Sequence, residues 1–258
     1  MNKKLKTLSL GLILALTMGV LAGCGQKPAE NESKTKEETS AEKDTKKEET
    51  EKTEATYKDI TGDDAKKLFE DKKFDGRIID VRPAEEYAAG HIVNAVNIPV
   101  DQLKDSLTSL EGFKDKDVIV YCNSGKKSTE AAKTLSENGF TKVSNADGVK
   151  KYTYDLVKYT DLDAAATEKL IADTKDLQIV DVRDASDFGK SHLENAKNIA
   201  LADLESKLDG LSKDKPVLVY CNSGFKSAQG AKTLQEKGFK TVYNAVDGVT
   251  EHEYKLVK

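Results

Sequence analysis

The chain has 258 residues, of which 38% are hydrophobic and 33% are charged, and its formal net charge is -4. This length allows one or two domains of ordinary size. Without the first 23 residues, which hold three lysines and no acid, 38 basic residues face 45 acidic ones and the charge is about -7. This part of the chain has no net positive charge with which to neutralise a phosphate backbone, which argues against a nucleic-acid partner.

The N-terminus has the features of a targeting segment, which is excluded from reasoning about the fold. A basic start precedes an apolar run, Leu8 to Val20, that is short for a membrane span. The four residues Leu21 to Cys24 then resemble a bacterial lipobox. The resemblance implies removal of a lipoprotein signal peptide, residues 1–23, and attachment of lipid to Cys24. The protein would then be anchored on the outer face of the cytoplasmic membrane, which in a Gram-positive cell is extracellular. The alternative is an ordinary secretory signal with a chance cysteine.

Residues 24–56 are dominated by lysine, glutamate, threonine and serine. From residue 26 onward this stretch has no aromatic residue and no aliphatic side chain larger than alanine. Such a composition cannot bury enough apolar area to offset the entropy lost on ordering. We therefore predict a disordered, charged tether that spaces the rest of the chain from the membrane.

The remainder of the chain is two copies of one unit. Val118 to Ala146 aligns without gaps with Val217 to Ala245, and 19 of these 29 positions are identical. Asp80 to Arg82 likewise recurs as Asp181 to Arg183. Ordered matches of this length indicate an internal repeat. We predict two domains, at residues 57–157 and 158–258.

Each unit alternates strand and helix patterns. In the first unit, Arg77 to Val81 is rich in β-formers, and Val118 to Tyr121 is an apolar run of the kind found in strands buried on both faces. Pro83 to Ala89 predicts a short helix, because proline fits the first turn. Ser128 to Glu137 predicts another, followed by a glycine, Gly139, that suits its end. The second unit has the same pattern, so we predict two α/β domains, each a small parallel sheet flanked by helices.

One short segment follows the apolar strand in each unit and carries a cysteine. The two segments are Cys122-Asn123-Ser124-Gly125-Lys126-Lys127-Ser128 and Cys221-Asn222-Ser223-Gly224-Phe225-Lys226-Ser227. A loop that turns from a strand into a helix points successive amides at its centre, and the helix dipole adds positive potential. A thiol there should have a lowered pKa and react as thiolate. We predict that the cysteines are the nucleophiles and that the other residues of each segment bind the substrate.

With four further motifs in each repeat, these loops resemble the rhodanese family. The motifs are Asp80-Val81-Arg82, Glu86-Tyr87, Gly90-His91-Ile92 and Asn97-Ile98-Pro99, with Asp181-Val182-Arg183, Asp187-Phe188, Ser191-His192-Leu193 and Asn198-Ile199-Ala200 in the second repeat. The resemblance implies a sulfurtransferase that takes sulfur from thiosulfate, a persulfide or a polysulfide onto its cysteine as a persulfide. A thiol, cyanide or a protein acceptor would then take the sulfur, without a metal or an organic cofactor.

One departure from the family leaves alternatives open. The sixth loop position commonly holds arginine, whereas this chain has Lys127 and Lys226, which lack the planar fork that grips an oxyanion at two points. A non-catalytic surface module that binds sulfur species or a protein partner is therefore an alternative. A cysteine-based phosphatase is less favoured, because its loop has seven residues and ends in arginine, whereas position seven here is Ser128 or Ser227.

Several other polar residues are predicted to have structural roles. His91 and His192 each lie in a short turn about thirty residues before the cysteine of their repeat and are expected to hold that turn. Arg82 and Glu86 are spaced i, i+4, which predicts an ion pair on a helix. Ser128 is expected to cap the following helix. The equivalents of these residues in the second repeat carry the same expectations.

The two loops differ in chemistry at their fifth position, where Lys126 corresponds to Phe225. The first pocket should therefore be the more cationic one. We predict that anionic donors such as thiosulfate react faster at Cys122, and that Cys221 favours less charged or apolar donors.

Overall fold

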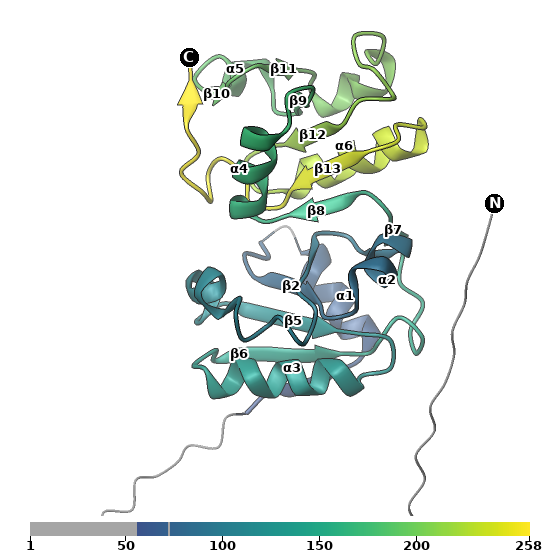
Figure 1. Ribbon diagram of the computed structural model, residues 1–258, viewed down its shortest axis with the longest axis vertical. Helices are drawn as coiled ribbons and strands as arrows, with labels where there is room; N and C mark the ends of the chain where they lie inside the picture. Colours follow the sequence, from purple (N-terminus) through teal and green to yellow (C-terminus); the bar gives the residue numbers. More distant parts are fainter. Residues whose placement is uncertain (1–55, 72) are drawn as a thin grey trace, which may run out of the picture. The chain divides into compact units, whose positions relative to one another are not determined.

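The computed structural model of the chain describes residues 56–71 and 73–258 (Figure 1). The predicted signal peptide, the predicted lipid attachment site at Cys24 and all but the last residue of the predicted tether lie outside this part.

The first repeat alternates strands and helices as expected (Figure 1). Its elements are β1 (Lys58–Ile60), α1 (Gly62–Glu70), β2 (Arg77–Asp80), α2 (Ala84–Ala89), β3 (His91–Ile92), β4 (Ala95–Asn97), the 3-10 helix η1 (Leu107–Phe113), β5 (Asp117–Tyr121), α3 (Lys126–Glu137), β6 (Lys142–Ala146) and β7 (Leu156–Val157). The helix α3 begins two residues before the predicted start, directly behind the glycine of the cysteine loop.

The second repeat has the same succession of elements. They are β8 (Thr160–Leu162), α4 (Ala164–Asp173), β9 (Gln178–Asp181), α5 (Ala185–Phe188), β10 (His192–Leu193), β11 (Ala196–Asn198), η2 (Leu201–Ser206), β12 (Val217–Tyr220), α6 (Phe225–Glu236), β13 (Val242–Ala245) and β14 (Leu256–Val257).

Each repeat contains one five-stranded sheet in which every neighbouring pair of strands is parallel. The strand order is β1-β6-β5-β2-β4 in the first repeat and, in the same sense, β8-β13-β12-β9-β11 in the second. The predicted α/β fold class is therefore confirmed. In both sheets the strand that precedes the cysteine is the central one, so its carboxyl end lies in the middle of the sheet edge where ligands bind in such folds.

The central strand β5 shows why the run Val118 to Tyr121 is apolar. Neighbouring side chains of a strand point to opposite faces. Val118 and Val120 pack in the core that contains α3, whereas Ile119 and Tyr121 pack in the core that contains α1. Cys122 continues the first of these rows and packs with the α3 core. Helix packing on both faces therefore fixes the direction in which the thiol enters its loop.

Buried polar contacts join the two repeats. Arg77 of β2 places Nη2 2.5 Å from Oδ1 of Asp247, and both side chains are largely buried. The backbone N–H of Asp161 donates to the hydroxyl of Tyr87 at 3.0 Å. The carboxylate of Asp161 also lies 3.5 Å from Nε2 of His91, and both side chains are fully buried. Burial is the largest influence on Asp161 and raises the pKa of its carboxyl, although His91 and neighbouring hydrogen bonds oppose this.

Candidate active site

The first cysteine loop wraps donors around a buried sulfur. Cys122 is 3% exposed and follows the last residue of β5 directly. Gly125 has φ +97°, a left-handed conformation that a residue with a side chain rarely adopts, and it turns the chain into α3. This turn brings the N–H of Gly125 to 3.2 Å from Sγ of Cys122. The hydroxyl of Ser128 lies 3.4 Å from the same sulfur.

These donors favour the ionised form of Cys122. Burial is the largest single influence and by itself raises the pKa of a thiol. The hydroxyl and N–H of Ser128 and the amides of Ser124 and Gly125 act against it. Together they hold the pKa of the Cys122 thiol below its ordinary value. A lowered pKa of this kind is typical of reactive thiols rather than of inert core cysteines.

The second loop repeats this arrangement. Cys221 is 2% exposed, and Gly224 has φ +76° at the start of α6. The N–H and the hydroxyl of Ser227 each lie 3.4 Å from Sγ of Cys221. Cys122 and Cys221 are both free thiols. Of the predicted loop residues, the structure therefore brings Gly125 and Ser128 to the sulfur of Cys122 and Ser227 to the sulfur of Cys221.

The prediction that Ser128 and Ser227 cap their helices is wrong. The N-cap positions are held by Gly125 and Gly224, which have no side chain that could cap. The serine hydroxyls instead lie between the cysteine sulfur and the carbonyl oxygen of that glycine, at 3.1 Å in the first loop and 3.0 Å in the second. Because α3 and α6 begin earlier than predicted, both serines fall inside the first turn and are buried there.

A glycine in the segment after β6 supports the first loop from behind, and sequence reasoning did not assign it a role at the site. A Cβ on Gly148 would lie 2.3 Å from the backbone of Asn123. The next two residues also hold the loop, because the N–H of Val149 donates to the carbonyl of Cys122 and that of Lys150 to the carbonyl of Asn123, both at 3.0 Å. Gly248 has the same position behind the second loop. The sequence does carry a signal, since Asp147 to Val149 recurs as Asp247 to Val249, and the contact with the cysteine loop gives this repetition a structural reason.

The predicted ion pairs of Arg82 with Glu86, and of Arg183 with Asp187, are also wrong. Arg82 instead binds Asp80, two residues earlier, with its Nη2 2.6 Å from Oδ2 and both side chains buried. Glu86 accepts a hydrogen bond at 2.5 Å from the side-chain amide of Asn123 in the cysteine loop.

The second repeat has the same Asp-x-Arg pair. Nη2 of Arg183 lies 2.6 Å from Oδ2 of Asp181. Arg183 also donates to the side-chain oxygen of Asn222 at 3.4 Å. A charged side chain therefore holds the second residue of each cysteine loop: Glu86 binds Asn123 in the first repeat, and Arg183 binds Asn222 in the second.

The histidines are structural, as predicted. Nδ1 of His91 lies 3.0 Å from the carbonyl oxygen of Tyr87, and its ring stacks on the Tyr87 ring with centroids 3.7 Å apart. His192 has the equivalent bond to the carbonyl of Phe188 and the equivalent stacking at 3.9 Å. Neither histidine is among the hydrogen-bond partners of the cysteine sulfurs in the described chain. The geometry therefore offers no Cys–His pair for a hydrolase.

The lysines of the two loops have different surroundings. Lys126 and Lys127 are exposed, and neither forms an ion pair with another residue of the described chain. A pocket of about 410 Å³ beside Lys127 is bounded by the segments that follow β2 and β4. Lys226, by contrast, has Nζ 3.5 Å from a carboxylate oxygen of Asp184. The first loop thus presents more unpaired positive charge than the second.

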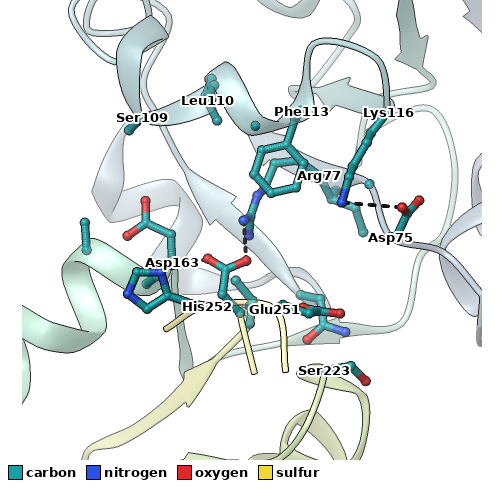
Figure 2. A pocket seen from close by; sticks show the side chains of 18 of the residues that line it. Asp75, Arg77, Ser109, Leu110, Phe113, Lys116, Asp163, Ser223, Glu251 and His252 are labelled. Atoms are coloured by element: carbon teal, nitrogen blue, oxygen red, sulfur yellow. Dashed lines mark hydrogen bonds and ion pairs between the residues drawn. The ribbon is translucent and has the colours of Figure 1, made fainter. Parts of the chain in front are cut away.

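A second pocket, of about 400 Å³, lies between the repeats (Figure 2). Ser223 of the second cysteine loop lines it, and Arg77 stacks over the ring of Phe113 with 4.2 Å to the centroid. The three basic side chains that line it each face an acid: Arg77 with Asp247, Lys116 with Asp75 and His252 with Glu168. This pocket therefore joins the repeats by internal ion pairs and offers little net attraction to an anion.

Comparison with known proteins identifies the family. A profile described as rhodanese-like domain matches residues 61–151 and 163–253, which together make up more than half of the chain. The chain belongs to the rhodanese-like family. Both matched segments contain one of the cysteine loops, so the tandem arrangement predicted from the sequence is confirmed.

Named relatives of the chain match a length close to that of one repeat. Thiosulfate sulfurtransferase PspE of Escherichia coli (strain K12) is 41% identical over 80 residues, which are 31% of this chain and 77% of that protein. Thiosulfate sulfurtransferase GlpE of Coxiella burnetii is 40% identical over 74 residues, 29% of this chain and 69% of that protein. A solved structure described as a rhodanese with anions from E. coli is 40% identical, covering 32% of this chain and 98% of that one, with a TM-score of 0.31. The sequence relatives support a sulfurtransferase.

Two further observations concern this rhodanese-like chain in the part that the structure describes. Residues 56–71 and 73–258 contain no group of three or more histidine, cysteine, aspartate or glutamate side chains placed to hold a metal ion. Within the same residues, no helix has both the length and the apolar composition needed to cross a membrane.

Proposed function

We propose that the protein is a sulfurtransferase in which Cys122 and Cys221 each carry sulfur as a cysteine persulfide. The observation that carries this proposal is the convergence of a loop N–H and a serine hydroxyl on a buried, free thiol in both repeats. Donors fixed in this way stabilise a negative sulfur before and after the transfer without reorganising.

The first step is an attack of the cysteine thiolate on the outer sulfur of a donor such as thiosulfate, a persulfide or a polysulfide. A new S–S bond forms to the cysteine, and the S–S bond inside the donor breaks. With thiosulfate the leaving group is sulfite, which departs with the electron pair of the broken bond. The protein is left with an anionic persulfide, and a thiol or cyanide takes the terminal sulfur in a second step, regenerating the thiolate.

The size of the loop favours sulfur over phosphate. The seventh position of each segment, counted from the cysteine, is a buried serine, Ser128 or Ser227, whose hydroxyl lies 3.4 Å from the sulfur. A phosphatase loop would have arginine at this position. Exposed lysines replace the arginine that would grip an oxyanion at two points. We therefore expect donors to be held mainly by the loop amides, with lysine contributing a general positive field.

Intact-protein mass spectrometry after treatment with thiosulfate or a polysulfide tests the proposal. We expect each cysteine to gain one sulfur atom that cyanide then removes. The single variants Cys122→Ser and Cys221→Ser should each retain one reactive site, and the double variant should have none. Reversible binding without any gain of sulfur at either cysteine would instead support the non-catalytic binding module.

For the N-terminus we propose a lipid anchor on Cys24, which would place both repeats on the outer face of the cytoplasmic membrane. The support is the basic start, the apolar run and the small residues before Cys24. Metabolic labelling with a fatty-acid probe in a bacterial host should mark the protein, and Cys24→Ala should abolish the label and release the protein from the membrane fraction. Label that persists in Cys24→Ala would contradict the anchor.

A further inference from the structure

We propose that an apolar pocket beside the second cysteine loop receives the organic substituent of the sulfur donor that reacts at Cys221. The substrate class would be singly charged donors with an alkyl or aryl group, such as thiosulfonates, rather than thiosulfate itself. This inference rests on the sulfurtransferase function proposed above and names the substrate of one of its two sites.

The pocket has a volume of about 280 Å³, and one residue of the second cysteine segment, Phe225, lines it. Phe225, the fifth residue of the loop and the first of α6, forms part of its wall, and Ala228 and Gln229 extend that wall along the next turn of α6. The apolar side chains that line the pocket come from both repeats and from the segment between them: Phe69, Val93, Tyr154, Val157, Tyr159, Phe225 and Ala228.

Charged side chains also line the pocket, and they form two ion pairs. Lys232 of α6 places Nζ 2.8 Å from a carboxylate oxygen of Asp155, and Lys66 and Glu70 of α1 are 3.7 Å apart. All four are partly or fully exposed, in contrast to the buried Tyr159 and Ala228. An apolar interior with a charged margin is the usual form of a small-molecule site.

The charge of the second loop fits a donor with one negative charge. Thiosulfate carries two, whereas a thiosulfonate replaces one charged oxygen by a carbon group. In the second loop, Phe225 likewise replaces the cationic Lys126 of the first, and Asp184 lies 3.5 Å from the remaining lysine, Lys226. The residue that removes positive charge from the loop is thus the same residue that supplies the apolar wall.

The reaction needs no additional reagent. The thiolate of Cys221 attacks the outer sulfur of the thiosulfonate, an S–S bond forms to the cysteine, and the bond between the outer sulfur and the sulfonyl sulfur breaks. The sulfinate leaves with the electron pair, and Cys221 retains the persulfide. The substituent remains on the leaving group, so contacts with the pocket wall can act while the bond breaks and end when the sulfinate departs.

A homologous donor series measures the effect. In the full chain carrying Cys122→Ser, single-turnover persulfide formation is followed by mass spectrometry with thiosulfate and with methane-, propane- and pentanethiosulfonate. Full burial of each added CH₂ corresponds to about a fourfold rise in kcat/KM, which sets the upper limit. We expect a clear rise along the series at Cys221 and a nearly flat series at Cys122 in the Cys221→Ser variant.

Two tryptophan substitutions locate the effect. Gln229→Trp at the exposed margin should fill the pocket and abolish the rise, while leaving the methane- compound reactive. Glu236→Trp on the last turn of α6 is a matched control that does not line the pocket and should leave the series unchanged. Phe225→Lys should flatten the series and improve the reaction with thiosulfate.

The outcomes separate this inference from the proposed function. Persulfide formation at Cys221 that is independent of chain length, or an equal dependence at Cys122, would overturn the pocket and leave the sulfurtransferase intact. A rise that survives Gln229→Trp would also overturn it. Absence of persulfide at Cys221 with every donor would overturn the function itself at that site.

Discussion

At Cys122 the fifth and sixth loop positions hold two exposed lysines, whereas at Cys221 they hold Phe225 and a lysine that faces Asp184. A serine hydroxyl lies 3.4 Å from each sulfur, whereas the backbone donor is the N–H of Gly125 in the first loop and the N–H of Ser227 in the second. Both repeats thus have a buried, free cysteine with polar partners after the central strand, and they differ at the fifth and sixth positions of the loop. If both cysteines carry sulfur as proposed, we expect one chemistry with two substrate preferences.

The residues near His91 and His192 also differ between the two repeats. Val93 and Val96 of the first repeat correspond to Glu194 and Lys197 of the second, which are exposed. His91 is fully buried against Asp161, whereas His192 is only partly buried. The first repeat thus has apolar residues on the face that contacts the second repeat. The second repeat has charged, exposed residues at the equivalent positions. Charges on a free strand also discourage pairing with another chain.

The largest effect on stability is expected at the junction histidine. His91→Ala leaves the buried carboxyl of Asp161 without its facing ring, and removing one partner of a buried pair costs about 3 kcal/mol or more. His192→Ala, at the equivalent free position, should cost about 1 kcal/mol from its lost hydrogen bond. Urea unfolding of the two variants measures both losses. Equal losses would show that contact between the repeats adds nothing to the role of His91.

The next largest effect is expected at Gly148 and Gly248, each of which supports one of the two cysteine loops. Gly148→Ala would place a Cβ 2.3 Å from the backbone of Asn123, so the first loop must shift. We expect a loss of about 2 kcal/mol in stability and, because small displacements misalign the nucleophile, up to about a hundredfold loss of reactivity at Cys122. Persulfide formation at each cysteine, resolved by peptide mass spectrometry, gives the comparison.

The controls for this substitution lie in the same chain. Reactivity at Cys221 should be retained in Gly148→Ala, and Gly248→Ala should reverse the pattern. Gly112→Ala, where a Cβ would meet nothing within 4 Å, should leave both sites reactive. A uniform loss at both cysteines in Gly148→Ala would indicate general unfolding rather than a local shift of the loop.

A smaller effect is expected from the serine hydroxyl. Ser128→Ala removes one of the donors that hold the pKa of the Cys122 thiol below its ordinary value, so this pKa should rise. A hydrogen bond of about 1 kcal/mol corresponds to roughly a fivefold loss of thiolate below the pKa. The rate of alkylation by iodoacetamide in a Cys221→Ser background should therefore fall at neutral pH and converge with that of the parent at high pH. An unchanged pH profile would show that the loop amides alone favour the thiolate.

Periodicity and repetition predicted most of the fold. The apolar run before each cysteine is typical of a strand covered on both faces, and the helix after each cysteine followed from its composition and the glycine at its end. The contacts that depend on distant segments were not predictable in this way. Arg82 binds Asp80 rather than Glu86 because α2 begins only at Ala84, so Arg82 lies outside the helix and the i, i+4 spacing does not apply to it. Likewise Gly148 meets Asn123 only because β6 lies beside β5 in the sheet.

The smallest expected effect tests the difference in donor preference directly. Thiosulfate should react faster in Cys221→Ser, which retains Cys122, than in Cys122→Ser, and equal kinetics would contradict the charge argument. Because the lysines are exposed, each charge should change the rate only about two- to fivefold. Lys126→Phe should slow the first site and Phe225→Lys should quicken the second.

Asp184→Pro completes this test, because it gives the second repeat the residue that the first repeat has at Pro83 and removes the acid beside Lys226. Both residues occupy the N-cap position of a short helix, so the backbone should accept the change. We expect a small rise in the rate with thiosulfate at Cys221, less than that of Phe225→Lys. Since exposed charges are screened by salt, these differences should shrink between low salt and 1 M salt. A difference that persists in high salt would have to come from the shape of the pocket rather than from charge.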